Sequence, residues 1–201
     1  MTNRTAHTEK LATKISAIIL AGGQGRRFNG EDKGLIDWRG KPLIQYVMTR
    51  LQPQVDQIII SCNRNIARYQ QFGHATCQDT LSDFQGPLAG IQAAMPLVKH
   101  PLVLVSPCDT TQLPYDLANQ LYDALSRNQA DVAYPLCNGR SHYLPALIKT
   151  DLLPSLLAYL QSSERSVRGW YQQHKASIVQ FADNDTSFSN FNYPEDLNAG
   201  N

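Results

Sequence analysis

The sequence contains no long hydrophobic run. No uninterrupted apolar stretch is longer than five residues, the length of the segment from Ala17 to Ala21, whereas a helix needs about 20 apolar residues to cross a bilayer. Residues 1–13 also lack the apolar segment of a secretory signal peptide. We therefore expect a cytoplasmic protein with no membrane association. We also expect a flexible N-terminal tail over residues 1–14, followed by a single domain over residues 15–201.

An excess of charge of either sign is also absent. The 18 basic and 17 acidic side chains give a formal net charge of +1, which provides no broad basic field for DNA or RNA. Any phosphate binding must therefore be local. Hydrophobic residues make up 42% of the chain and charged residues 17%, which is the balance of a globular protein and excludes a disordered one.

Metal-ligand spacings are missing as well. The chain has four cysteines, at positions 62, 77, 108 and 137, and no two of them form a C-x-x-C pair. Its five histidines are scattered. A zinc site is therefore not indicated, and the cysteines are expected to be free, small core residues.

Short apolar runs alternate with segments of helical period. Strands are predicted over residues 15–21, 57–61, 102–106, 131–135, 144–149 and 177–182, helices over residues 42–51, 65–72, 88–98, 114–126, 152–161 and 167–174, and a last helix from Pro194. This alternation predicts an α/β fold, a three-layer α/β/α arrangement around a mostly parallel sheet. Ligands bind such sheets beyond the carboxyl ends of the strands.

A glycine-rich segment follows the first predicted strand. Its glycines are at positions 22, 23, 25, 30 and 34, and Arg26, Arg27 and Lys33 lie among them. Glycine lets backbone N–H groups approach an anion, and the cations offset its charge. A surface turn with solvated charges is the alternative. Because a strand leads directly into the segment, phosphate binding is favoured.

Two familiar phosphate-binding loops do not match this segment. The dinucleotide fingerprint G-x-G-x-x-G fails because Phe28 stands where the third glycine belongs. The Walker loop fails because Glu31 and Asp32 replace its Lys-Ser/Thr pair. Hydride transfer and P-loop hydrolysis are therefore disfavoured.

Asp109 comes just after the apolar strand predicted over residues 102–106. A carboxylate at this position suits Mg²⁺, which prefers one or two carboxylates together with substrate phosphates. The alternative is that Asp109 caps the next helix. Asp109 alone does not distinguish between metal binding and helix capping. The glycine-rich segment is expected at the same edge of the sheet, and this favours metal binding. For Asp79, a turn or cap role is the simpler reading.

These segments together resemble a known family. The resemblance rests on residues 20–33, 40–43, 86–90, 107–110 and 190–196. They are similar to the molybdenum cofactor guanylyltransferases, which have a nucleotide-diphosphosugar transferase-like fold. The resemblance implies transfer of GMP from GTP to Mo-molybdopterin, release of diphosphate and a need for Mg²⁺. It also implies possible contact with other molybdenum cofactor biosynthesis proteins, and we expect a monomer.

The resemblance also implies a role for individual residues. Catalysis would involve Arg27, Lys33 and Asp109, with Asp109 holding Mg²⁺. The GTP-binding residues would be Leu20, Ala21, Gly22, Gly23, Gly25, Lys33, Ser61, Asp79 and Asp109. The molybdopterin side would be formed by Gly86, Gly90, Asn190 and Asn192. Ser61 stands where the family often has asparagine, but a serine still offers one hydrogen bond.

Three other functions remain open from the sequence. They are cytidylyl transfer to the same acceptor, nucleotidyl transfer to a sugar phosphate, and GTP binding by a non-catalytic regulator or carrier. An acid paired with a cation favours an enzyme over a regulator, because binding alone needs only the loop. The proposed reaction needs no Ser-His-Asp arrangement, since the attacking phosphate is already anionic.

Overall fold

The body of the protein is a mixed sheet covered by helices. The computed structural model describes residues 13–23, 25–79, 86–182, 186–191 and 193–197. The order of the main strands across the sheet is β10-β7-β9-β6-β1-β4-β5. Their bounds are β1 Ile15–Leu20, β4 Gln57–Ser61, β5 Ala75–Cys77, β6 Leu102–Pro107, β7 Val132–Cys137, β9 Ala146–Lys149 and β10 Ala176–Gln180.

Most neighbouring strands of this sheet are parallel. β1 pairs in parallel with both β4 and β6, β4 with β5, and β7 with β10. β9 is the exception, because it runs antiparallel to β6 on one side and to β7 on the other. The short strand β8 (Arg140–Ser141) pairs with β7, and β2 (Asp37–Trp38) forms a separate hairpin with β3 (Lys41–Pro42).

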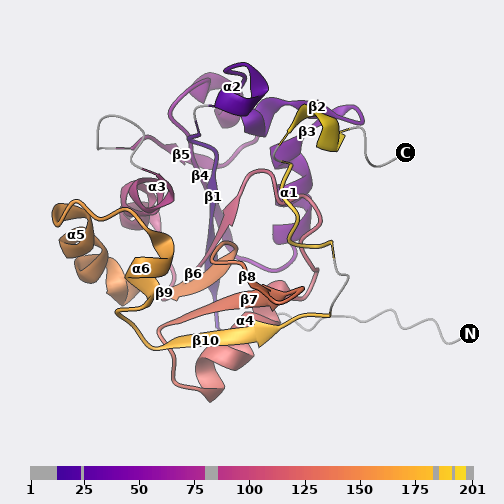
Figure 1. Ribbon diagram of the computed structural model, residues 1–201. Coiled ribbons are helices and arrows are strands. Elements are labelled where there is room, and N and C mark those ends of the chain that lie inside the picture. Colours follow the sequence, from indigo (N-terminus) through magenta and orange to yellow (C-terminus); the bar gives the residue numbers. More distant parts are fainter. Residues whose placement is uncertain (1–12, 24, 80–85, 183–185, 192, 198–201) are drawn as a thin grey trace, which may run out of the picture.

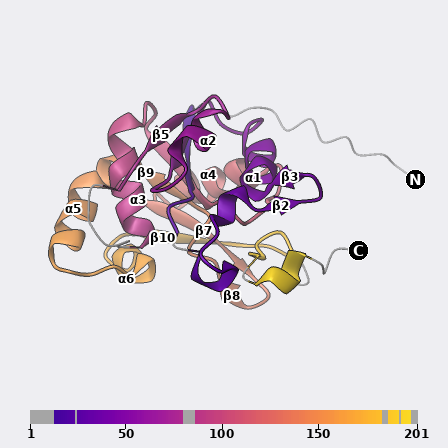
Figure 2. The same ribbon diagram turned by 90° about the horizontal axis from the view of Figure 1, so that it is seen from above.

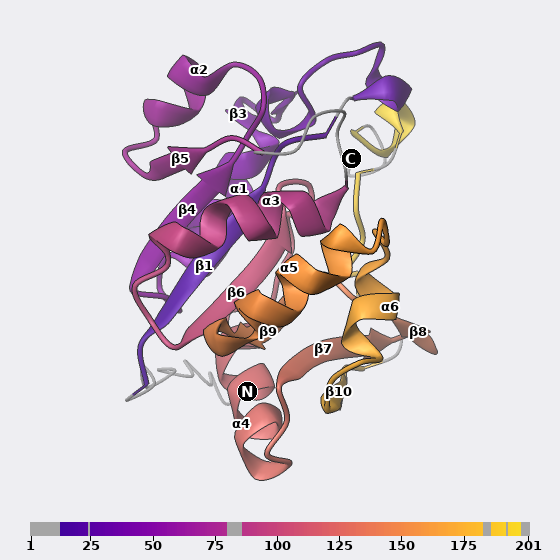
Figure 3. The same cartoon turned by 90° about the vertical axis from the view of Figure 1, so that its left-hand side faces the viewer.

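Helices cover both faces of the sheet (Figure 1). Their bounds are α1 Leu43–Leu51, α2 Ile66–Gln70, α3 Pro87–Ala94, α4 Leu117–Arg127, α5 Leu153–Gln161 and α6 Val167–Tyr171. α3, α5 and α6 lie in front of the sheet in Figure 3, and the view from above in Figure 2 places α1 on the other side from these three. No helix in the described ranges combines the length and the hydropathy needed to cross a membrane.

The residue alternation of β1 explains these layers. Ile15, Ala17 and Ile19 belong to one buried cluster together with apolar residues of α1 and α4. Ile18 belongs to the opposite cluster, with apolar residues of α3, α5 and α6. Both sides of the strand are therefore buried, and each fully buried isoleucine contributes about 1.5–3 kcal/mol. The predicted three-layer α/β fold with a mostly parallel sheet is confirmed.

The predicted elements differ from the observed ones mainly at their ends. The helix predicted over residues 88–98 ends at Ala94 and continues as a 3-10 turn over Met95–Leu97, because Pro96 has no N–H to continue an α-helix. The helix predicted from residue 114 begins at Leu117. The segment from Pro194 is a 3-10 turn over Pro194–Leu197 and not an α-helix.

Four short strands were not predicted. They are β2, β3, β5 and β8, each two or three residues long. A period of two residues cannot be recognised over such a length, so the sequence gives no signal for them. The predicted tail over residues 1–14 falls largely outside the described residues, and the division into a tail and one domain stays a prediction.

Candidate active site

A cleft opens at the carboxyl ends of three central strands. Its volume is about 560 Å³, which is in the usual range for a small-molecule site. The last residues of β1, β4 and β6 contribute to its wall. The lining residues are Leu20, Gly22, Gly23, Gly25, Arg27, Phe28, Lys33, Ser61, Asp79, Gly86, Pro87, Gly90, Pro107, Asp109, Leu144 and Asn190.

Most of the predicted site residues meet in this cleft. Two do not contribute to its described wall. Ala21 is buried, and its backbone N–H donates to the carbonyl of Ser61 over 2.7 Å. Ala21 therefore lies beneath the glycine loop and not along the cleft. Asn192 lies outside the described residues.

The glycine loop (residues 22–23 and 25–34) is folded tightly on itself. Gly25 has φ +65°, and a Cβ atom at this position would lie 1.8 Å from the carbonyl oxygen of Glu31. The carbonyl of Gly25 accepts hydrogen bonds from the N–H groups of Phe28 and Gly30. Only glycine can occupy this position, because any side chain would collide with backbone that cannot give way.

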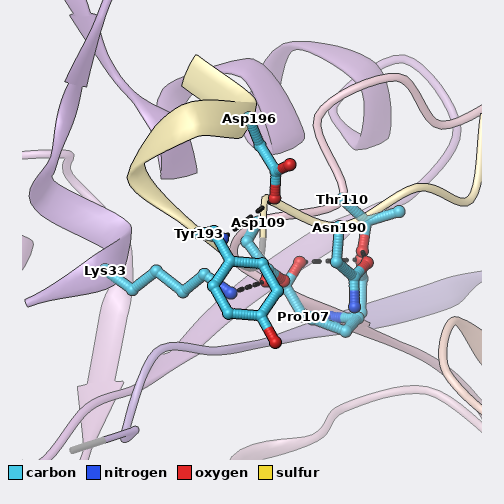
Figure 4. Close-up of polar contacts among 8 residues, drawn as sticks. Lys33, Pro107, Asp109, Thr110, Asn190, Tyr193 and Asp196 are labelled. Atoms are coloured by element: carbon cyan, nitrogen blue, oxygen red, sulfur yellow. Dashed lines mark hydrogen bonds and ion pairs between the residues drawn. The ribbon is translucent and has the colours of Figure 1, made fainter. Parts of the chain in front are cut away.

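Lys33 and Asp109 form an ion pair in the wall of the cleft. The ammonium group of Lys33 donates to Oδ2 of Asp109, and Figure 4 shows the two side chains pointing toward each other. The side chain of Asp109 is 8% exposed and that of Lys33 is 23% exposed. The pair brings together two residues that are 76 positions apart in the chain.

Neither acid caps the helix that follows it, so the cap role is wrong for both, while a turn role for Asp79 stays a prediction. α4 begins at Leu117 with Asp116 as its N-cap residue, so Asp109 is too far away to cap it. α3 begins at Pro87 with Gly86 as its N-cap residue, so Asp79 does not cap that helix. Both carboxylates face the cleft instead.

Asp79 is held by a reciprocal pair of hydrogen bonds with Asn63. Nδ2 of Asn63 donates to Oδ2 of Asp79 over 2.8 Å, and the backbone N–H of Asp79 donates to Oδ1 of Asn63 over 2.9 Å. The other carboxylate oxygen, Oδ1, is buried and has no hydrogen-bond partner among the described residues. A buried acceptor of this kind is costly unless a ligand satisfies it.

A second buried acid lies beside Lys33. Asp32 accepts hydrogen bonds from the hydroxyl of Tyr69 and from Nδ2 of Asn65. Burial is the main cause that raises the pKa of the Tyr69 phenol above its usual range, and the nearby Cys108 adds to it. The phenol therefore stays protonated and donates its hydrogen bond to Asp32.

The thiol of Cys108 also has a raised pKa, because it is buried and lies near the charge of Asp109. This thiol therefore stays neutral and is not a nucleophile.

The C-terminal arm (residues 186–191 and 193–197) borders the same cleft. The hydroxyl of Thr110 donates to Oδ1 of Asn190 over 2.7 Å, as Figure 4 shows. The ring of Phe191 packs against Trp38 of the β2–β3 hairpin, with centroids 4.9 Å apart. The guanidinium of Arg27 lies 5.2 Å above the ring of Tyr193. The arm is thus attached to both the Asp109 loop and the glycine loop.

Several cleft residues were not predicted. Phe28, Pro87, Pro107 and Leu144 line the wall, and Asn63 fixes Asp79. Leu144 gives no signal in the sequence, because its place depends on how β9 returns to β6. Asn63 gives no signal either, because its partner Asp79 is 16 positions away in the chain.

The comparisons with known proteins agree with this geometry. Residues 17–178 match the family described as MobA-like NTP transferase domain. A molybdenum cofactor guanylyltransferase from Shewanella amazonensis is 42% identical over 93% of this chain and 95% of its own length. Its counterpart from Shewanella frigidimarina is also 42% identical, over 92% of this chain and 94% of its own length.

This chain belongs to the molybdenum cofactor guanylyltransferase family. The resemblance inferred from the sequence is confirmed, and the chain is a nucleotidyltransferase. A solved structure also shares its fold: molybdopterin-guanine dinucleotide biosynthesis protein A from Archaeoglobus fulgidus, with a TM-score of 0.72, 21% identity, and coverage of 92% of this chain and 95% of that one.

Nucleotidyltransferases of this kind generally use a divalent metal ion. Within the described part of the chain, no group of three or more histidine, cysteine or acidic side chains could hold one. Asp109 offers a single carboxylate to the cleft. This fits a hard cation that takes one or two protein carboxylates and completes its shell with water and substrate phosphates.

Proposed function

We propose that this nucleotidyltransferase transfers GMP from GTP to Mo-molybdopterin and releases diphosphate. The main support is the ion pair of Lys33 and Asp109 beside a glycine loop, in a chain 42% identical to a molybdenum cofactor guanylyltransferase. A loop alone would suffice for GTP binding. An acid and a cation in the same wall favour catalysis, because both are needed to manage charge during transfer.

The reaction is a substitution at the α-phosphorus of GTP. An oxygen of the acceptor's terminal phosphate forms a new bond to this phosphorus, and the bond to the bridging oxygen of the β-phosphate breaks. Diphosphate leaves with that oxygen. The attacking phosphate is already anionic, so no general base is required. The protein must align two anions and neutralise charge.

Mg²⁺ is the proposed metal, with Asp109 as its protein ligand. When bound, it would polarise the phosphate and stabilise the charge on the leaving diphosphate. Lys33 and Arg27 supply positive charge from the glycine loop to the phosphates. Gly22, Gly23 and Gly25 let the backbone approach them closely.

The base of GTP is assigned to the side of the cleft formed by Ser61 and Asp79. Oδ1 of Asp79, which has no hydrogen-bond partner in the described part of the chain, is an acceptor, and guanine presents N–H donors on its Watson–Crick edge. Cytosine presents one exocyclic amine there, so the match to guanine is better. Leu20, in the wall of the cleft, is proposed to lie along the nucleotide. Ala21 is proposed to act only through its backbone, which is bonded to Ser61.

The acceptor side is assigned to Gly86, Gly90 and Asn190, which line the same cleft, and Asn192 is proposed to join them. Gly90 lies beside the base side, because a Cβ atom on it would be 2.7 Å from Oγ of Ser61 and 3.5 Å from Oδ1 of Asp79. Asn190 is fixed by Thr110, so an acceptor bound there would lie next to Asp109. We further propose that the protein is a cytoplasmic monomer that contacts other molybdenum cofactor biosynthesis proteins. It is proposed to bind neither nucleic acid nor a membrane.

The test is product formation with matched nucleotides. Purified protein, Mo-molybdopterin and Mg²⁺ are incubated with GTP, CTP or ATP, and the product is identified by mass spectrometry while diphosphate is measured. We expect the guanylyl adduct, with GTP preferred by about 100-fold or more, because a site built for one base leaves buried groups unpaired with another. A preference for CTP would show a cytidylyltransferase, and GTP binding without diphosphate release would show a regulator.

A further inference from the structure

Arg64 is joined to the glycine loop by three hydrogen bonds. It lies in the turn between β4 and α2 and is half-buried. Its Nη1 donates to the carbonyl of Gly30 over 2.7 Å. Its Nη2 donates to the carbonyls of Gly23 and Glu31 over 3.1 and 3.2 Å. One planar guanidinium group thus connects the beginning of the loop to its end.

Other contacts hold single points of the loop. Lys33 pairs with Asp109, Asp32 accepts from Tyr69 and Asn65, and Nδ2 of Asn63 donates to the carbonyl of Gly22 over 3.4 Å. Among the described residues, the backbone hydrogen bonds inside the loop run between Gly25, Phe28, Gly30 and Glu31 and do not include the carbonyl of Gly23. Glycine carries no side chain that could anchor the segment, and it has the largest backbone freedom of any residue. A donor that spans both ends of the loop therefore removes freedom that the loop cannot remove itself.

The backbone that carries Arg64 is itself fixed on both sides. Asn63 is bonded to Asp79, and Asn65 donates to Asp32 over 3.0 Å. Asn65 also has φ +49° and stands at the N-terminus of α2. The backbone of Arg64 is therefore held in place, and its planar guanidinium makes several hydrogen bonds at a smaller loss of freedom per bond.

The direction of the three carbonyl groups that Arg64 binds also affects the electrostatic potential in the cleft. A carbonyl oxygen is the negative end of the peptide dipole, and one directed into the cleft would repel a phosphate. We propose that Arg64 is a positioning residue that holds the glycine loop in its phosphate-binding shape by engaging these three carbonyls. The inference rests on the proposed function for its link to GTP, but the effect on the loop does not.

The test combines a kinetic and a structural measurement on three variants. Arg64→Ala removes the contacts. Arg64→Lys keeps the charge but cannot reach three carbonyls with one planar group. Arg68→Ala is the matched control, because Arg68 is an exposed arginine on the adjoining helix α2. Steady-state rates with GTP are measured for each, and amide hydrogen exchange of the glycine loop is followed without nucleotide.

We expect Arg64→Ala to raise KM for GTP by about tenfold with a small change in kcat, because binding energy is used to order the loop. Loop amides should exchange at least about tenfold faster, while β1 and β4 keep their protection. Arg64→Lys should recover only part of both effects, and Arg68→Ala should match the unaltered protein.

Three results would overturn the inference. They are unchanged loop exchange in Arg64→Ala, an unchanged KM despite faster exchange, and full recovery by lysine, which would show that charge alone matters. If the unaltered protein transfers no guanylyl group, the proposed function fails separately. Hydrogen exchange then still decides whether Arg64 holds the loop, since that measurement uses no nucleotide.

Discussion

Lys33 occupies a position where its charge serves the cleft and not the core. It pairs with Asp109, its ammonium also lies 5.5 Å from the ring of Phe28, and its side chain is 23% exposed. The short turn that carries it, Lys33–Leu35, is fixed instead by the buried Leu35 and by backbone bonds to Asp32 and Lys33. The shape of this turn therefore does not depend on the lysine side chain.

Replacing Lys33 with alanine should damage catalysis and spare the fold. We expect kcat/KM for GTP to fall, with a loss of about 2–4 kcal/mol of transition-state stabilisation. This is the usual cost of losing one strong charge contact in such a site. The thermal midpoint should change by only a few degrees. Lys99→Ala, at an exposed lysine just before β6, is the control. A rate for Lys33→Ala close to that of the control would remove Lys33 from the reaction.

Single residues of the site differ in how far the sequence revealed them. Lys33, Arg27 and the glycines stood out because they cluster within 13 consecutive positions. Arg64 did not, because its partners are 33 to 41 positions away and are backbone carbonyls, which carry no sequence signature. Contacts of this kind are decided only when the chain folds.

At the scale of elements, Asp131 connects three strands at one end of the sheet. Its Oδ1 accepts from the ammonium of Lys149 at the end of β9, and its Oδ2 accepts from the backbone N–H of Lys175, just before β10. Burial tends to raise its pKa. The hydrogen bonds from Lys149 and Lys175, with the charges of Lys149 and His174, outweigh this, and the pKa of Asp131 is lowered from its ordinary value.

This arrangement predicts a stability contribution that disappears in acid. A carboxyl whose pKa is lower in the folded state stabilises the fold above its ordinary pKa, and the contribution is lost as the pH falls through the folded value. We expect Asp131→Asn to lower the free energy of unfolding by about 0.5–1 kcal/mol at neutral pH, because the pair is partly exposed.

Urea unfolding at neutral pH and near pH 2 would measure this difference. Asp123→Asn, at an exposed aspartate on α4, controls for the loss of a negative charge. The difference between Asp131→Asn and the unaltered protein should shrink toward zero in acid. A difference that persists unchanged at low pH would show that the carboxylate charge is not involved.

Elements were predictable where their periodicity was long enough. The buried strands β1, β4 and β6 were located to within a residue or two, because each is a short apolar run rich in β-branched residues, and glycine follows β1 while prolines lie at both ends of β6. The antiparallel direction of β9 was not predictable. It depends on the pairing of residues 146–149 with both β6 and β7, and no local pattern specifies a strand's direction.

At the scale of the whole molecule, the cleft is assembled from distant segments. β1 supplies the glycine loop, β4 the turn with Asn63 and Arg64, β6 the loop with Asp109, and the C-terminal arm Asn190. Their strands are adjacent and parallel, so their carboxyl ends meet at one edge. Sequence reasoning could predict this edge. Strand order and periodicity alone could not predict that the C-terminal arm returns to it, because that contact depends on the packing of Phe191 against Trp38. Only the family resemblance implied that Asn190 lies at the site.

The central claim is that Asp109 holds the metal in a centre for guanylyl transfer, and Asp109→Asn tests it most directly. Asparagine keeps the shape and can still accept from Lys33, but it lacks the charge that a divalent cation needs. The rate of guanylyl transfer and the thermal midpoint should be measured side by side, with Asp151→Asn, an exposed acid, as the control. We predict a rate at least about 100-fold lower, only partly restored by raised Mg²⁺, and a nearly unchanged midpoint. A rate close to that of the unaltered protein would contradict the account and place the catalytic centre elsewhere.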